Sequence, residues 1–470
     1  MARALRLTTN RRALAFHWLV LAIATLGCSG VLAMGVAAAR VPILARHLTN
    51  TDFARRVLVV HVDLGVVAWF CALPVALFHF YRIEADRTAS ASWSAAVAPW
   101  LSSLGALLLL VGLVPGLGTV YLVNYIPLVV HPLYLAGLAL FLLGLGLSYL
   151  DRGLLRGSFG APTLPAKDEA SRALPRLMAQ TLAASGHLVD LGATYVLLAL
   201  FALGSGILRI PGDLEDAPRI EMLMWGPGHI FQFANVAFLM VAWLLLAAWG
   251  SGRRPDAGLG AVSTLLAIPL LPVLFLLVAG PSWEGSQAGF TWLMQWALFP
   301  ALLLFLALVL APHFRGTHDG GEASSRAVLW PLSASVALML VGFVYGGLIG
   351  GSDLRIPGHY HASIGAVTLS YMALSLLLLQ DHESGVIADP RMLRAMALLY
   401  GVGQFTFATG LMLAGSYGLG RKIFGVDQRV DQFWQAMGLR VMAVGGLLAF
   451  LGGAVWAWAA VRRLRAIASA

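Results

Sequence analysis

The stretch IPGHYHASIG, residues 356–365, decides how this chain is interpreted, because it places two histidines at the start of a long apolar segment. A histidine in the hydrocarbon of a membrane is costly unless a partner holds it. Residues i and i+2 of an α-helix point about 200° apart, so His359 and His361 face opposite sides of one helix. A metal ion bound by both would favour a spacing of three or four residues. The motif therefore predicts two imidazoles that serve two separate centres.

The sequence around this motif is almost entirely apolar. Hydrophobic residues make up 59% of the 470 residues and charged residues only 11%, a composition that excludes an ordinary soluble domain. A membrane-spanning helix needs about 20 apolar residues, and such runs recur along the whole length. Because helices satisfy their own backbone hydrogen bonds in lipid, we expect one all-α polytopic membrane domain over residues 1–470.

Twelve apolar segments are long enough to cross a lipid bilayer. With the N-terminus in the cytoplasm, the cytoplasmic side carries about 20 Lys and Arg residues and the outer side about 11, in accord with the positive-inside rule. Both termini are then cytoplasmic. The net charge of +9 fits anionic lipid headgroups, and we expect no nucleic-acid partner. The segments lie roughly at 13–36, 57–82, 95–115, 125–149, 180–207, 225–249, 259–280, 289–311, 328–350, 357–380, 392–415 and 435–461.

Four histidines fall at one predicted depth. In this orientation the second, sixth and tenth segments all begin at the outer side. His61 and His229 lie about four residues into the second and sixth segments, and His359 and His361 open the tenth. Because each helical residue rises 1.5 Å, these side chains share a level near the outer surface. Independent packing residues would not be expected to gather in this way.

Haem fits this set of histidines better than zinc does. Zinc favours a compact tetrahedral set of ligands, whereas an iron with two axial histidines takes one from each of two helices. His61 with His361 could hold one such six-coordinate haem, and His359 could hold a second haem from one side, leaving a position open for a diatomic gas. A lone membrane histidine is more often a packing residue, and we interpret His131 and His187 in that way.

Basic residues at the same level suit the haem propionates. Arg421 and Lys422 lie in the outer loop between the last two segments, and Arg355 lies just before the tenth. A guanidinium matches a carboxylate with two hydrogen bonds. Simple loop charge is the alternative, but the outer loops are otherwise poor in positive charge, so we expect propionate contacts.

These residues resemble subunit I of the haem-copper oxidase superfamily, which includes cytochrome c oxidases and nitric oxide reductases. The resemblance spans essentially the whole chain, and the His-x-His motif is its most specific part. It implies that His359 ligates a high-spin, gas-binding haem and that His61 and His361 ligate a low-spin haem. It also implies that His229 ligates a second metal, copper or non-haem iron, and that Arg421 and Lys422 lie near the propionates.

The chain departs from the family around the second metal and the proton path. The family has two adjacent histidines near the outer end of its seventh helix, where residues 277–284 read LVAGPSWE, so Glu284 is only a weak candidate ligand. Phe233 stands where many oxidases have a tyrosine, neither lysine lies inside a predicted helix, and the usual glutamate of the sixth helix is absent. We therefore expect a divergent member that holds a second metal weakly, if at all, and does not pump protons.

Three functions from different classes follow. The first is an enzyme that passes electrons from the low-spin haem to the high-spin haem and reduces oxygen or nitric oxide. The second is a non-catalytic haem protein, either an electron-transfer subunit or a gas sensor. The third is a haem-free transporter, which would need paired ionisable residues near the bilayer midplane, and the sequence has few of these.

The partners of the haem functions follow from what the chain contains. No soluble cytochrome or copper domain is evident in the sequence. We therefore expect electrons from quinol, from a soluble cytochrome or from a separate subunit. The lipid bilayer is the expected surrounding, and the bacterial inner (cytoplasmic) membrane is the expected location.

Overall fold

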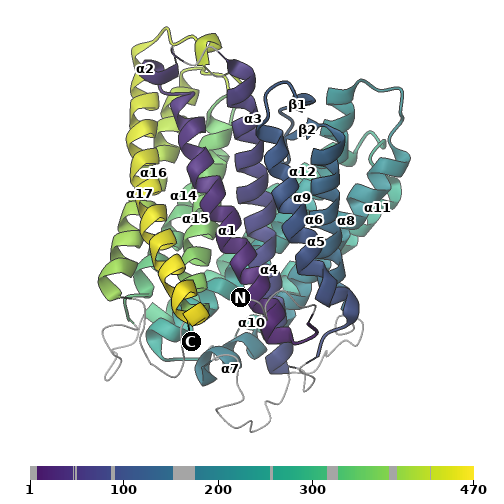
Figure 1. The fold of residues 1–470 in the computed structure, drawn as a ribbon, viewed down its shortest axis with the longest axis vertical. Coiled ribbons are helices and arrows are strands. Elements are labelled where there is room, and N and C mark those ends of the chain that lie inside the picture. The colour runs from purple at the N-terminus through teal and green to yellow at the C-terminus, as the bar shows by residue number, and fades with distance from the viewer. Residues whose placement is uncertain are drawn as a thin grey trace.

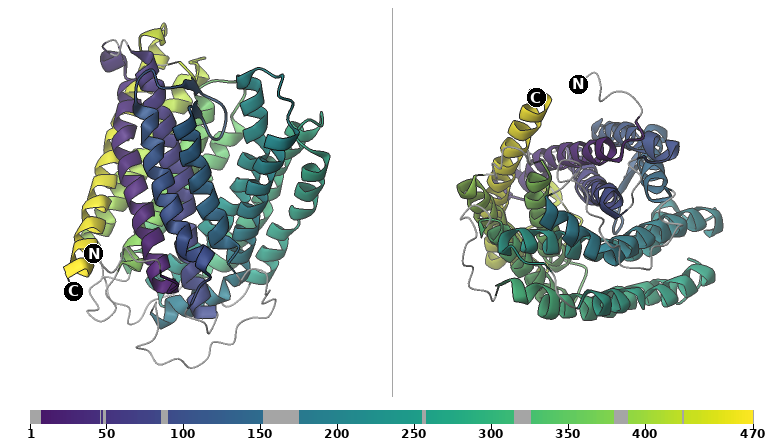
Figure 2. Two further views of the ribbon diagram at one scale, coloured as in Figure 1. Left: turned by 45° about the vertical axis from the view of Figure 1, so that its right-hand side comes forward. Right: turned by 90° about the horizontal axis from the view of Figure 1, so that it is seen from below.

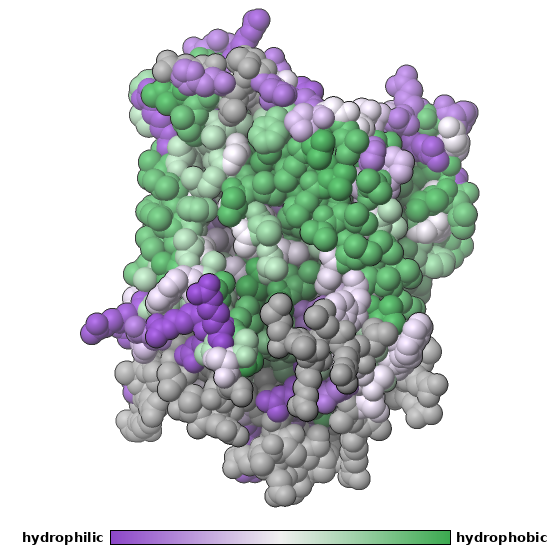
Figure 3. Space-filling view, viewed as in Figure 1, coloured by the Kyte–Doolittle hydropathy of each residue, from purple (hydrophilic) through white to green (hydrophobic). Residues whose placement is uncertain are grey.

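The computed structural model describes residues 8–45, 47, 50–85, 90–151, 175–254, 258–314, 326–379, 389–423 and 425–469. In this part of the chain, twelve helical spans are long and apolar enough to cross a membrane. The predicted twelve-helix, all-α architecture is therefore confirmed. Most of the expected long polar loop, residues 152–174, lies outside the described residues. Figure 3 shows the surface that this architecture produces, a broad apolar belt with polar residues toward both ends.

The long helices run side by side (Figure 1, Figure 2). The first six spans comprise α1 (Arg11–Ala38), α3 (Thr51–Val62) continued by the π-helix η1 (Asp63–Trp69) and α4 (Phe70–Ala85), α5 (Trp93–Leu109) with the 3-10 turn η2 (Leu110–Leu113), α6 (Pro132–Tyr149), α8 (Gly186–Arg209) and α9 (Asp216–Ser251). The last six comprise α10 (Leu259–Ala267) with α11 (Leu270–Ala279), α12 (Ser286–Leu304) with η4 (Phe305–Leu310) and η5 (Ala311–Phe314), α14 (Leu329–Gly347), α15 (Arg355–Leu378), α16 (Pro390–Ser416) and α17 (Phe433–Ser469). The shorter elements are α2 (Pro42–Ala45), β1 (Thr119–Tyr121), β2 (Leu128–Val130), α7 (Arg176–Ala184) and η6 (Gly425–Asp427).

The three helices that carry the histidines form the interior of the bundle. In the most apolar window of each span, 72% of the residues are buried for Thr51–Glu84, 89% for Asp216–Ser251 and 83% for Arg355–Leu378. The corresponding share is at most 44% for the other nine spans. The fold thus places the second, sixth and tenth spans where side chains from all three can converge.

Helices α16 and α17 pack closely at glycine residues, where no side chain separates the two backbones. A methyl group added at Gly445 would lie 2.2 Å from the backbone nitrogen of Phe407, and one added at Gly410 would lie 2.3 Å from that of Met442. Such contacts show that the two backbones touch, as small residues allow in membrane helices. This packing fixes the position of Phe407, which reaches the site described below.

The fourth span begins later than predicted. Residues 125–131 do not belong to a helix; instead β1 pairs antiparallel with β2, with Thr119 opposite Val130 and Tyr121 opposite Leu128. Helix α6 begins at Pro132, whose missing N–H is not needed at the first helical position. The His131 side chain accepts a hydrogen bond of 3.3 Å from the Leu133 backbone N–H, so it acts as the N-cap of α6. The prediction that this histidine is structural agrees with that contact.

Two other spans begin earlier than predicted, and one is interrupted. The second span starts at Thr51 and the sixth at Asp216, rather than near residues 57 and 225. Polar residues extend both helices beyond their apolar parts, with Asn50 capping the first through a 3.0 Å bond from the Phe53 N–H. The estimate that His61 and His229 lie about four residues into their helices is therefore wrong. The seventh span is divided between α10 and α11 near Pro269, as expected from the missing N–H of proline.

Candidate functional site

His61 is held by the neighbouring helix α1. Its Nδ1 lies 2.9 Å from the Ser29 carbonyl oxygen and 3.0 Å from the Ser29 hydroxyl, which in turn donates to the His61 carbonyl at 2.9 Å. A carbonyl only accepts hydrogen bonds, so Nδ1 carries the proton and Nε2 keeps its lone pair. Gly65 allows this approach, because a methyl group there would lie 2.6 Å from the Ser29 hydroxyl. The hydrogen bonds of the described residues leave Nε2 of His61 without a partner.

His359 is held in the same manner by α14. Its Nδ1 donates to the Gly342 carbonyl oxygen at 2.7 Å. The ring fits against Gly346, where an added methyl group would lie 2.9 Å from Nδ1. No described group bonds to Nε2, which again keeps its lone pair. A histidine whose Nδ1–H is fixed by a carbonyl presents Nε2 to a metal in a defined direction.

His361 faces a different helix from His359, as their spacing requires. Its ring packs edge-on against Phe407 of α16, with ring centres 4.8 Å apart, and lies 5.0 Å from the ring of Tyr360. His61 and Arg40 lie within electrostatic reach of it. No hydrogen bond to either ring nitrogen is found among the described residues. The two helices α3 and α15 thus bring His61 and His361 near one another, each with a free ring nitrogen.

Accessible surface remains beside these rings within the bundle. His61, His359 and His361 are only half-buried although they lie on two of the three innermost helices. Tyr360 is 40% exposed, yet Arg40 and Arg421 lie within electrostatic reach of it. Part of the surface of each ring is therefore free to contact another group.

His229 differs from the other three histidines because both of its ring nitrogens have partners. Nδ1 donates to the Trp225 carbonyl oxygen at 2.7 Å, and Nε2 lies 2.8 Å from the Tyr125 hydroxyl. The ring is 1% exposed and packs between Trp225 and Phe290, at centre distances of 5.1 and 6.4 Å. A metal ion could bind His229 only by displacing one of these hydrogen bonds.

The second predicted ligand of the additional metal lies elsewhere. Glu284 is exposed in the turn between α11 and α12, whereas His229 is buried. Across the described ranges, no group of three or more His, Cys, Asp or Glu side chains could hold a metal ion. The residues present therefore do not fit a copper or non-haem iron centre at His229.

Arg421 and Lys422, which were predicted to contact the haem propionates, lie in the loop between α16 and α17. Arg421 donates from Nη2 to the Asn124 side chain at 2.5 Å, while its buried Nε has no hydrogen-bond partner. Lys422 is exposed; burial of part of its side chain and the charge of Arg421 lower its pKa, partly offset by Glu221. The unpaired Nε of Arg421 is a buried donor that lacks an acceptor, which a carboxylate would supply.

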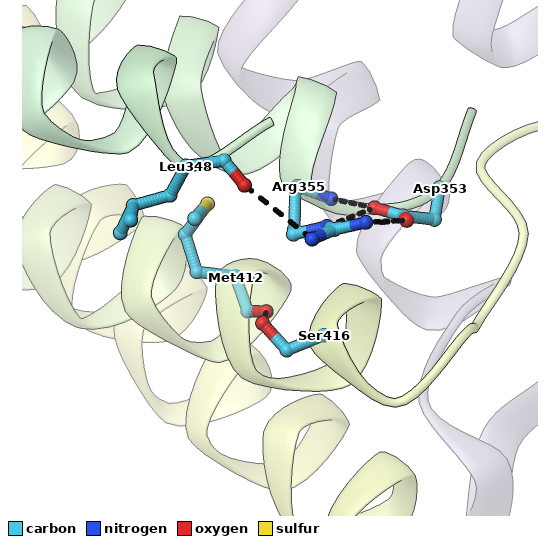
Figure 4. Close-up of polar contacts among 5 residues, drawn as sticks. All are labelled: Leu348, Asp353, Arg355, Met412 and Ser416. Carbon is cyan, nitrogen blue, oxygen red and sulfur yellow. Dashed lines mark hydrogen bonds and ion pairs between the residues drawn. The ribbon is translucent and has the colours of Figure 1, made fainter. Parts of the chain in front are cut away.

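Arg355 is engaged in an ion pair at the start of α15 (Figure 4). Its Nη2 lies 2.7 Å from an Asp353 carboxylate oxygen and its Nε 3.0 Å from the other. Burial alone would raise the pKa of Asp353. The hydrogen bonds and positive charge of Arg355 have the larger, opposite effect, so the pKa of this carboxyl lies below its ordinary value. A hydrogen bond of 3.0 Å from Leu354 N–H to the Leu419 carbonyl ties this turn to the loop that carries Arg421.

Three residues of the site were not identified from the sequence. Arg40, at the end of α1, is buried and donates to the Arg421 carbonyl; burial lowers its pKa to about 10, so it stays charged at neutral pH. Its position directly after the first apolar segment was a usable signal. Ser29 acts partly through its backbone, and Tyr125 lay in a segment predicted to be helical, so neither residue type nor spacing marked them.

Two observations fit a haem at this site. His61 and His359 each have Nδ1 fixed by a backbone carbonyl and Nε2 free, the arrangement of a prepared metal ligand. The buried Nε of Arg421 lacks an acceptor near Tyr360, where a propionate would provide one.

Comparison of the sequence with known proteins finds relatives that are themselves uncharacterised. No protein-family model matches the chain. An uncharacterised protein of Aquifex aeolicus (strain VF5) is 28% identical over 77% of this chain and 84% of its own length. An uncharacterised protein of Rickettsia prowazekii (strain Madrid E) is 22% identical over 96% of both chains.

A chain of a haem-copper terminal oxidase dimer, solved by cryo-electron microscopy, matches the structure with a TM-score of 0.73. The match covers 96% of this chain and 84% of that chain at 17% sequence identity. An identity this low shows the fold alone. The chain therefore has the twelve-helix fold of a haem-copper terminal oxidase, and its chemistry must be argued from its own residues.

Proposed function

We propose that this protein is a membrane haem protein that passes electrons from a low-spin bis-histidine haem to a high-spin haem, where a small gas, oxygen or nitric oxide, is bound and reduced. The observation that carries the proposal is the state of the histidine rings. His61 and His359 have Nδ1 fixed by a backbone carbonyl and Nε2 free, in a fold shared with a haem-copper terminal oxidase. Histidines that served only packing would not need a ring nitrogen with a free lone pair.

The three free histidines take separate roles in this proposal. His61 and His361, from α3 and α15, would hold the low-spin haem. Bonds from α1 set the ring plane of His61, while Phe407 restricts that of His361. His359 would hold the high-spin haem, with its ring fixed by the bond from Nδ1 to the Gly342 carbonyl oxygen of α14.

The propionates are proposed to meet the basic residues at the outer end of the bundle. Arg421 has a free Nε, and Lys422 follows it in the same loop. Arg355 would contribute through its Nη1, which also donates to the Leu348 carbonyl oxygen at 3.4 Å, since its other nitrogens bond to Asp353. Arg40 adds a buried charge beside Tyr360, so four cations can balance the carboxylates.

The wider setting is also a proposal. The whole chain would act as one twelve-helix unit in a bacterial inner membrane with both termini cytoplasmic, a location supported by relatives from two bacteria. Quinol, a soluble cytochrome or a separate subunit would supply electrons. The missing lysine and glutamate of the family argue against proton pumping. The second metal predicted at His229 and Glu284 forms no part of this proposal, because both ring nitrogens of His229 are engaged.

A non-catalytic haem protein is the second candidate, and the partners of His229 favour it. Both ring nitrogens of His229 are engaged, so the gas-binding side lacks the prepared second-metal ligand of an oxidase. This candidate binds a gas to the reduced protein without sustained turnover. Steady consumption of oxygen or nitric oxide with an added reductant excludes it.

Spectroscopy of the purified protein tests both candidates. We expect two haems per chain, with carbon monoxide binding to one of them after reduction. Replacing His61 or His361 with leucine should remove the low-spin spectrum, and His359→Leu should remove carbon monoxide binding. His187→Leu is the control, since His187 is exposed on α8 and belongs to none of these contacts. A wild-type protein without haem would disprove the proposal.

A further inference from the structure

The loop between α5 and α6 inserts a tyrosine against the sixth span. Tyr125 lies between strands β1 and β2 and has a backbone φ of 69°, the one positive value at a non-glycine residue in the described chain. This left-handed conformation is strained for a tyrosine and persists only where the surroundings enforce it. The insertion therefore needs a structural reason, which its neighbours supply.

Asn124 and Gly228 enforce the position of Tyr125. The backbone N–H of Asn124 donates to the Glu221 carboxylate at 2.9 Å, and its side-chain NH₂ bonds to the same carboxylate. Gly228 makes room for the tyrosine ring, since a methyl group there would lie 2.3 Å from the ring carbon Cγ. Helix α9 thus provides both an anchor for the loop and a recess for the ring.

The hydrogen bonds of His229 assign the proton positions. Nδ1 faces the Trp225 carbonyl, which only accepts, so Nδ1 bears the hydrogen. Nε2 then has a lone pair, and the Tyr125 hydroxyl donates to it at 2.8 Å. Burial and the charge of Glu221 raise the pKa of Tyr125, against the opposite effect of Arg421, so the hydroxyl keeps its proton at neutral pH.

We propose that His229 is not a metal ligand in this protein and that Tyr125 and His229 form a phenol–imidazole pair in place of a second metal. A metal ion would need the lone pair that Tyr125 occupies, and the described residues form no group of three or more His, Cys, Asp or Glu side chains that could hold it. The inference goes beyond the proposed function, because it concerns a pair that exists with or without haem.

Metal analysis and vibrational spectroscopy of one set of full-length variants test the pair. The set is wild type, Tyr125→Phe, His229→Leu and Tyr121→Phe. Tyr121 is the matched control, because it lies on the same hairpin and its hydroxyl donates to the exposed Asp216 at 2.8 Å. Each protein is incubated with Cu²⁺ or Fe²⁺ and desalted, and its metal content is measured after subtraction of haem iron.

The expected result has two parts. Metal binding should not depend on His229, so wild type and His229→Leu should contain the same amount of copper or non-haem iron. In infrared difference spectra with isotope-labelled tyrosine, the C–O band of one tyrosine should shift in His229→Leu and vanish in Tyr125→Phe, but remain in Tyr121→Phe. Tyr125→Phe keeps the ring against Gly228, so it remains informative if His229→Leu does not fold.

Two outcomes overturn the proposal. One is about one copper or non-haem iron per chain that is lost when His229 is replaced. The other is an infrared result that shows no such pair. Either the tyrosine C–O band stays unchanged in His229→Leu, or every tyrosine C–O band of the wild type is still present in Tyr125→Phe. Haem content is measured separately, so loss of the haem proposal and loss of this pair are distinguishable.

Discussion

Replacing Gly445 with alanine should separate α16 from α17, whereas the same change at Gly453 should not. The added methyl group at position 445 would lie 2.2 Å from the Phe407 nitrogen and 2.7 Å from the Gly403 carbonyl oxygen, both backbone atoms that cannot swing away. Ordinary contact begins at 3.4 Å, so the helices must part by about 1 Å, at a typical overpacking cost of about 1–3 kcal/mol. At Gly453 nothing lies within 4 Å of the added group.

The two variants share one intrinsic term, because alanine favours a helix over glycine by about 0.5–1 kcal/mol at either position. Their difference therefore reports the contact alone. We expect Gly445→Ala to unfold with a free energy about 1–3 kcal/mol below that of Gly453→Ala, measured by denaturant titration in mixed micelles. Haem-dependent absorbance should shift only in Gly445→Ala, because Phe407 packs on His361. Equal unfolding free energies for the two variants would refute the reasoning.

Two further predictions concern the ends of the site. Ser29→Ala removes the hydroxyl beside His61 but leaves the hydrogen bond to the Ser29 carbonyl oxygen. The affinity for the low-spin haem should therefore fall about fivefold, which corresponds to a net loss of about 1 kcal/mol. A loss of haem as complete as that in His61→Leu would contradict this prediction. Because Arg355 holds the folded-state pKa of Asp353 below its unfolded value, the pair contributes stability that is present at neutral pH and lost as pH falls through the folded pKa. Asp353→Asn should therefore lower the melting temperature at pH 7 but not under strongly acidic conditions, and a deficit that persists in acid would disprove this role.

The twelve spans were predictable because each apolar run is long enough to cross a bilayer. Their ends were not, because helix ends depend on caps and polar residues that hydropathy does not register. Residues 128–130 are as apolar as a helix, yet they pair with residues 119–121. The second span begins six residues earlier than predicted, at Thr51, where the Asn50 side chain caps the helix.

The histidines of the site were predictable by residue type and level, but what holds them was not. The bond from His359 goes to the carbonyl of Gly342, and any residue at that position carries a carbonyl. The hydroxyl beside His229 comes from Tyr125, in a segment whose hydropathy predicted a helix. Contacts made by backbone atoms, or by a loop in an unusual conformation, leave no spacing pattern in a sequence.

The π-helix η1, which starts two residues after His61, changes the rotation of the outer half of the second span about the helix axis relative to the inner half. A π-helix accommodates one residue more than the surrounding α-helix, and one residue corresponds to a turn of about 100°. The inner half of the span can thus keep its packing orientation while the outer half aims the imidazole. If the same residues formed a regular α-helix instead, the outer half would turn by about 100° and carry His61 away from His361 without changing any side chain that touches either ring.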